Sequence, residues 1–86
     1  MTFNNKAKKM FIDLGYKVEY DDEFIRYYKD MGHDSYIFVD IDRENETFLK
    51  HQDGWARPID RQELMAINMQ MHEISVYKAN KENKAK

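Results

Sequence analysis

The sequence predicts an α+β domain: an antiparallel β-meander of three to four strands, flanked by an N-terminal helix and a longer C-terminal helix. Three observations predict this fold class. Apolar residues recur at helical spacing at both ends of the chain, residues 16–51 alternate between apolar and polar, and a helix-start motif follows at Asp60. We expect one domain over residues 1–80 and a flexible, lysine-rich tail over residues 81–86.

The first helix is expected from about Thr2 to Leu14. Its apolar side chains share one narrow arc of the helical wheel, and they are Phe3, Ala7, Met10, Phe11 and Leu14. The next residue is Gly15, and a glycine at this position adopts the left-handed conformation that ends many helices. The helix is therefore expected to stop at Gly15.

Two hairpins are expected in the middle of the chain. In the first, Asp21 and Asp22 form a two-residue turn that pairs Val18 with Ile25. In the second hairpin, residues 30–34 form the loop, which pairs Tyr27 with Ile37 and Ile25 with Val39. Because successive side chains of a strand point to opposite faces, this register gathers an apolar core face. That face consists of Val18, Ile25, Tyr27, Ile37, Val39 and Ile41.

The chain beyond the third strand is less regular. Residues 42–46 form a polar turn, and residues 47–51 form a shorter fourth strand. Trp55 is expected in a loop closed by Asp53 and Gly54.

The C-terminal helix is expected from about Arg61 to Asn80, because Asp60 and Glu63 form a capping box. It carries two apolar stripes, one of Leu64, Ile67, Met71 and Ile74 and the other of Met65, Met69 and Val76. Its polar side is expected at Gln62, Glu63, Gln70 and Glu73. In one interpretation the first stripe packs on the sheet and the second packs on the N-terminal helix. In the other, the second stripe contacts a partner or a second copy through Met65, Met69, His72 and Val76, since methionine suits adaptable interfaces.

The sheet face opposite the core is the second candidate surface. The expected register places Phe24, Arg26, Tyr28, Tyr36 and Phe38 on it. Aromatic residues and arginine are concentrated in the energetic centres of protein interfaces, and aromatic rings also stack on single-stranded nucleic acid. The alternative is that a helix covers this face, or that the true register turns it inward.

Catalytic and metal-binding motifs are not apparent. The acidic run from Asp40 to Glu44 resembles the start of a calcium loop, but Asn45 stands where the loop needs glycine and His51 where it needs glutamate. The three histidines come from separate segments without metal-ligand spacing, and the lack of cysteine excludes thiolate chemistry. We therefore expect no catalytic residues, cofactor or metal.

Charge and hydropathy narrow the choice of partner. The net charge is −2, which gives no overall attraction to nucleic acid, and no apolar run approaches the ~20 residues of a membrane span. The first residues lack the apolar core of a secretory signal, so a cytoplasmic protein is expected. Lysines do cluster near both ends, and nucleic-acid binding is the alternative function for that reason. These are Lys6, Lys8, Lys9, Lys78, Lys81, Lys84 and Lys86.

Four segments together resemble small proteins of unassigned function encoded by phages and prophages of Gram-positive bacteria. They are Ala7–Tyr16, Ile25–Tyr27, Phe38–Asp42 and Glu63–Asn68. The resemblance implies an accessory factor that binds and modulates a host or phage protein, including inhibitors of defence proteins. The predicted function is thus a small non-enzymatic protein-binding module, and a homodimer through the C-terminal helix is compatible with it.

Overall fold

The computed structural model describes residues 6–85 of the chain, with side chains described for residues 6–80. Its elements are α1 (Lys6–Asp13), β1 (Lys17–Tyr20), β2 (Phe24–Gly32), β3 (Ser35–Asp42), β4 (Thr47–Gln52), β5 (Trp55–Ala56) and α2 (Arg61–Ala85). The strands form one antiparallel sheet in the order β1-β2-β3-β4-β5. The predicted α+β meander between two helices is therefore confirmed, with one strand more than the sequence predicts.

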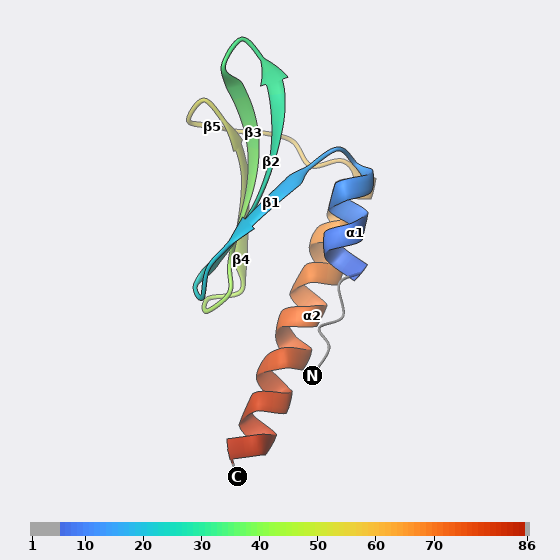
Figure 1. Cartoon of the computed structure of the whole chain (residues 1–86), viewed down its shortest axis with the longest axis vertical. Helices are drawn as coiled ribbons and strands as arrows, with labels where there is room; N and C mark the ends of the chain where they lie inside the picture. The colour runs from blue at the N-terminus through green and yellow to red at the C-terminus, as the bar shows by residue number, and fades with distance from the viewer. Residues whose placement is uncertain (1–5, 86) are drawn as a thin grey trace.

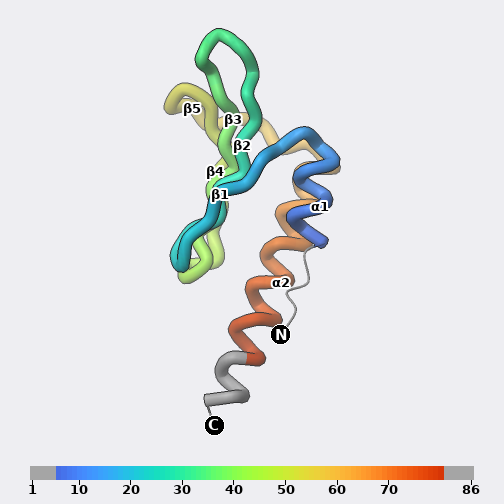
Figure 2. The backbone as a smooth tube through the Cα atoms, in the orientation of Figure 1, coloured from blue at the N-terminus to red at the C-terminus, as the bar shows by residue number. Residues whose placement is uncertain are grey.

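The molecule has two layers. The sheet forms one layer, and both helices lie on the same side of it (Figure 1). The helix α1 packs alongside the first half of α2, and the β2–β3 hairpin extends beyond the helical layer (Figure 2). We call the sheet face toward the helices the inner face and the opposite one the outer face.

The end of α1 follows the prediction. Gly15 has a φ of 95°, and its N–H donates to the carbonyl of Ile12, while the N–H of Tyr16 donates to the carbonyl of Phe11. These two bonds form the Schellman motif, which satisfies the last carbonyls of a helix. The predicted start at Thr2 and the predicted arc residue Phe3 lie outside the described residues.

The predicted register of β1 and β2 is wrong by two residues. Val18 pairs with Tyr27 rather than with Ile25. The N–H of Asp21 donates to the carbonyl of Phe24 over 2.9 Å, so the reversal is centred on Asp22 and Glu23 rather than on Asp21 and Asp22. The carboxylate of Asp21 accepts hydrogen bonds from the N–H groups of Glu23 and Phe24 and stabilises this turn. A shift of two keeps every side chain on its predicted face, because the side-chain period of a strand is two.

The register of β2 and β3 shifts in the same way. Tyr27 pairs with Val39 rather than with Ile37, because the predicted loop over residues 30–34 is mostly strand. The reversal occurs at His33 and Asp34, whose φ angles are 53° and 60°. Positive φ at both central residues is the geometry of a type I′ hairpin turn, in which asparagine and glycine are more common.

The strand β5 corrects the prediction that Trp55 lies in a loop. Asp53 and Gly54 have φ angles of 52° and 83° and make a second tight turn, after which Trp55 pairs with Gln52. The resulting strand contains only Trp55 and Ala56.

The helix α2 begins where the capping box predicts. The N–H of Asp60 donates to the carboxylate of Glu63 over 3.1 Å, and the N–H of Glu63 donates to Asp60 over 2.8 Å. The helix continues to Ala85 rather than ending near Asn80. Side chains of the predicted lysine-rich tail, residues 81–86, lie outside those that the structure describes.

The predicted faces of α2 are partly wrong. Glu63 and Gln70, which were assigned to its polar side by periodicity, are 5% and 8% exposed. Both have polar partners on other elements: Glu63 bonds to Tyr16 and Lys50, and Gln70 accepts a bond from Tyr27. These bonds allow the polar side of α2 to pack toward the core.

The core lies between the inner face and the two helices. Its buried members are Ala7, Phe11, Tyr16, Ile25, Tyr27, Ile37, Val39, Ile41, Ala66, Ile67 and Ile74. The rings of Phe11 and Tyr27 stack with centroids 3.7 Å apart, which joins α1 to the sheet. All six residues of the predicted core face point inward, with Val18 partly buried.

Candidate functional site

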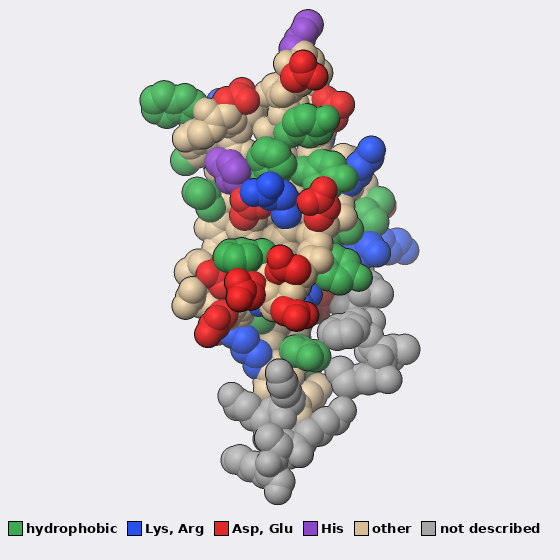
Figure 3. All heavy atoms as spheres, turned by 60° about the vertical axis from the view of Figure 1, so that its left-hand side comes forward, with side chains coloured by type: hydrophobic (Ala, Val, Ile, Leu, Met, Phe, Trp, Pro, Cys, Tyr) green, Lys and Arg blue, Asp and Glu red, His purple; other side chains and the backbone are tan. Residues whose placement is uncertain are grey.

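The outer face carries the first group of predicted contact residues. The strand alternation places Arg26, Tyr28, Tyr36 and Phe38 on this face together, and neither helix covers it (Figures 1 and 3). Tyr36 is 38% exposed and Arg26 is exposed, whereas Tyr28 and Phe38 are half-buried by their neighbours. The alternative in which a helix covers these residues is therefore wrong.

Phe38 lies at the centre of this face. The guanidinium carbon of Arg26 is 4.4 Å from the Phe38 ring centroid, and the His51 ring stacks on Phe38 with centroids 5.2 Å apart. Tyr36 stacks with Phe38 at 6.2 Å, and Tyr28 packs edge-on against Tyr36 at 6.4 Å. Such contacts favour this arrangement of the rings over others. The face is therefore a preorganised aromatic surface.

An ionic network runs beside the rings. Arg26 donates to both carboxylate oxygens of Asp40, over 2.7 Å from Nε and 3.0 Å from Nη2. The Nε2 atom of His51 lies 2.7 Å from the same carboxylate. Partial burial alone would raise the pKa of Asp40, but the hydrogen bonds from Arg26 and His51 outweigh it and hold that pKa below its usual value. Asp40 is thus a carboxylate at neutral pH.

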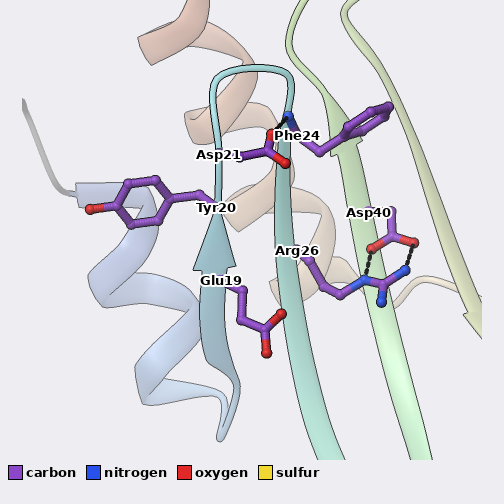
Figure 4. A pocket seen from close by; sticks show the side chains of 6 residues that line it. All are labelled: Glu19, Tyr20, Asp21, Phe24, Arg26 and Asp40. Carbon is purple, nitrogen blue, oxygen red and sulfur yellow. Dashed lines mark hydrogen bonds and ion pairs between the residues drawn. The ribbon is translucent and has the colours of Figure 1, made fainter.

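An open hollow of about 410 Å³ lies at the β1–β2 end of the outer face (Figure 4). It is lined by Glu19, Tyr20, Asp21, Phe24, Arg26 and Asp40. Glu19 and Arg26 point to the same side of the sheet, while the ring of Tyr20 points away from them. Backbone N–H groups of Phe24 and Glu23 lower the pKa of Asp21, which keeps it ionised.

The second group of predicted contact residues forms a stripe on α2. Met65 and Val76 are 56% and 45% exposed, His72 is exposed and Met69 is half-buried. By helical geometry this stripe lies opposite the buried side of α2, so it faces away from the sheet. The interpretation in which the stripe packs on α1 is therefore wrong. The helix contact with α1 includes Glu73, which accepts a bond from the N–H of Ala7 over 3.1 Å.

The two predicted groups do not form one site. The outer face and the α2 stripe lie on opposite sides of the two-layer structure, so one flat partner surface cannot contact both. Sequence reasoning missed Asp40 and His51 as parts of the outer face. His51 pairs with Phe38 across β3 and β4, and paired residues lie on the same face of a sheet. The register of β3 and β4 is therefore the signal that places His51 on the outer face.

A buried polar cluster lies in the interior rather than at a surface. Lys50 Nζ is 2.8 Å from Glu63 Oε1, and their side chains are 10% and 7% exposed. The hydroxyl of Tyr16 also donates to Glu63. Burial first, and then the bond to Glu63, raise the pKa of Tyr16. The cluster ties the start of α2 to β4 and to the end of α1, which is a structural role.

Other kinds of site have little support within the described part. Across residues 6–80, no three His, Asp or Glu side chains come together as metal ligands. No helix in the described ranges combines the length and the apolar character that crossing a membrane requires. The outer face is therefore the best-formed candidate surface.

Comparisons with known proteins add no assignment. No protein-family model, curated protein or solved structure matches the chain. The resemblance to small phage and prophage proteins stays a prediction.

Proposed function

We propose that this chain is a small, non-enzymatic protein-binding module that contacts its partner through the outer face. The observation that carries the proposal is the partly exposed aromatic cluster around Phe38 on the outer face, which neither α1 nor α2 covers. Isolated apolar side chains are normal on a protein surface, but an ordered aromatic group beside an arginine matches the composition of interface centres. As an accessory factor or inhibitor encoded by a phage or prophage, such a module acts by occupying a surface of a host or defence protein.

Charge favours a protein over nucleic acid as the partner. The guanidinium of Arg26 packs on the Phe38 ring, and its charge is already paired with Asp40. Glu19 lies on the same side of the sheet (Figure 4). Lys17 pairs with Tyr28 on the same face and is exposed, so a phosphate backbone approaching the rings would meet the cations of Lys17 and Arg26 beside the carboxylates of Glu19 and Asp40, with no excess of positive charge. Nucleic-acid binding relies on such an excess to neutralise phosphates.

The test is an affinity capture from a Gram-positive bacterial lysate, with and without nuclease, read by mass spectrometry. The baits are the wild type, a Tyr28→Ala/Phe38→Ala variant, and a Met65→Ala/Val76→Ala variant as the matched surface control. We expect a protein that the wild type and the control recover and the outer-face variant does not, whether or not nuclease is present.

Two results would count against the proposal. Recovery that disappears with nuclease would indicate nucleic-acid binding instead. Equal recovery by all three baits would mean that the outer face does not contact the partner. Circular dichroism of each bait establishes that it is folded before the comparison is made.

A further inference from the structure

Acidic side chains border the hollow end of the outer face. The β1–β2 turn carries Asp21, Asp22 and Glu23, Asp42 ends β3, and the β3–β4 turn carries Glu44 and Glu46. The two turns are adjacent, because the N–H of Arg43 donates to the carbonyl of Glu23 over 2.9 Å. Figure 3 shows the acidic side chains gathered at this end of the face.

The cations near these turns only partly offset the carboxylates. Arg43 lies 5.9 Å from the centroid of the Tyr20 ring, and Lys78 Nζ donates to the backbone carbonyl of Glu44. The exposed lysines of α1, by contrast, belong to the helical layer on the other side of the sheet. The net charge of the chain is small because two oppositely charged regions offset each other. The end of the outer face at the β1–β2 and β3–β4 turns is acidic, and the helical layer is basic. Such a separation orients an incoming charged partner.

The hollow combines this charge with apolar surface. Glu19, Asp21 and Asp40 supply three carboxylates to its lining, Arg26 supplies one cation, and Phe24 supplies an aromatic ring. Phe24 is 46% exposed, so its ring is accessible to a partner. The hollow has a volume of about 410 Å³ and is open to solvent, so a long side chain can enter it.

Arg26 does not turn the hollow into an anion site. Two of its nitrogen atoms already donate to Asp40, and the negative charge of Glu19 acts on it as well. A carboxylate or phosphate entering the hollow would have to displace Asp40 and approach Glu19. A lysine or arginine side chain meets the opposite situation, because the lining holds three carboxylates against one arginine and offers an aromatic ring to pack against.

We infer that the partner contacts the outer face with a basic polypeptide segment, and that one of its lysine or arginine side chains occupies the hollow lined by Glu19, Asp21 and Phe24. This inference rests on the proposed protein-binding function and names the chemistry of the partner. The aromatic cluster around Phe38 supplies the apolar contact, and the carboxylates supply the selectivity for positive charge.

The experiment selects short random peptides, displayed on yeast, for binding to the wild type, and then removes those that also bind the Tyr28→Ala/Phe38→Ala variant. Retained peptides are synthesised, and their affinities are measured by fluorescence anisotropy for the wild type, Glu19→Lys and Asp13→Lys. Glu19 and Asp13 are both exposed, and Asp13 belongs to α1 in the other layer. The two variants therefore make the same change in net charge at different places.

We expect the retained peptides to be enriched in lysine and arginine relative to the starting library. Their affinity should fall roughly five- to tenfold in Glu19→Lys, change little in Asp13→Lys, and weaken as salt is added. Retained peptides that are neutral or acidic, or that do not distinguish Glu19→Lys from Asp13→Lys, would overturn the inference and leave protein binding intact.

Two other outcomes would contradict both this inference and the proposed protein-binding function on which it rests. If no peptide distinguishes the wild type from the Tyr28→Ala/Phe38→Ala variant, the proposed function itself is contradicted. Tighter binding of a single-stranded oligonucleotide than of any retained peptide would have the same effect, because phosphate carries the opposite charge.

Discussion

The guanidinium carbon of Arg26 lies 4.4 Å from the Phe38 ring centroid while Nε and Nη2 of the same group donate to Asp40. One side chain thereby links the aromatic and the ionic parts of the outer face. Arginine suits this position because its planar group can stack and form two parallel hydrogen bonds at once, which lysine cannot do. A change at Arg26 should therefore affect both parts together.

Replacement of Arg26 by glutamine should raise the pKa of Asp40. Partial burial raises this pKa, while the hydrogen bonds from Arg26 and His51 lower it. Without Arg26, only His51 opposes the effect of burial, so the pKa should rise. The depressed pKa of the folded wild type contributes stability above the unfolded value of about 3.9, and this contribution is lost as pH falls through the folded value. A pH titration of the Asp40 carboxyl carbon by NMR measures the change. Lys17→Gln is the control, and an unchanged titration in Arg26→Gln would show that the ion pair does not determine the pKa.

Replacement of Lys50 by methionine should destabilise the fold strongly. It leaves Glu63 buried without its cation, and breaking one side of a buried ion pair typically costs about 3–5 kcal/mol. The double variant Lys50→Met/Glu63→Gln should recover part of the loss, because no buried charge is then left unpaired. Urea denaturation gives the free energies of unfolding. A loss in Lys50→Met no larger than that of a surface substitution, about 0.5 kcal/mol, would contradict a structural role for the cluster.

The sequence predicts which face of each strand is buried better than it predicts which residues pair. Alternation alone assigns Ile25, Tyr27 and Val39 to the core, and a two-residue error in register leaves that assignment unchanged. The register depends on turn geometry instead. The side-chain bonds of Asp21 and the positive φ angles at His33 and Asp34 are not encoded by alternation, so both hairpins shift.

The faces of α2 could not be derived from periodicity for a different reason. Glu63 and Gln70 are polar, and they are buried because Tyr16, Lys50 and Tyr27 supply hydrogen-bond partners from distant segments. A helical wheel contains no information about those segments. The same limitation applies to the outer face: its rings could be grouped from the strand pattern, whereas the network through Asp40 and His51 required the position of β4.

Replacement of Asp60 by alanine should weaken the start of α2. Its carboxylate accepts the N–H of Glu63 over 2.8 Å, and loss of such a cap costs roughly 0.5–2 kcal/mol. Urea denaturation with circular dichroism at a helical wavelength measures this. Asp13→Ala at the end of α1 is the matched control, because a negative charge at a helix C-terminus is not stabilising. Equal losses in the two variants would show that the bond to Glu63 contributes nothing specific.

The exposed α2 stripe of Met65, Met69, His72 and Val76 should mediate self-association. In a single copy the stripe faces away from the sheet, so a second copy of α2 would shield its apolar surface from water. Sedimentation velocity of the wild type should therefore show a larger species as concentration rises, and Met65→Glu/Val76→Glu should stay monomeric. Because both positions are exposed, the double variant should unfold at nearly the same urea concentration as the wild type.

Tyr28→Ala/Phe38→Ala, altered on the opposite side of the molecule, should still associate. A wild type that stays monomeric at every concentration would contradict the homodimer, and loss of association only in the Tyr28→Ala/Phe38→Ala variant would locate the contact on the outer face instead.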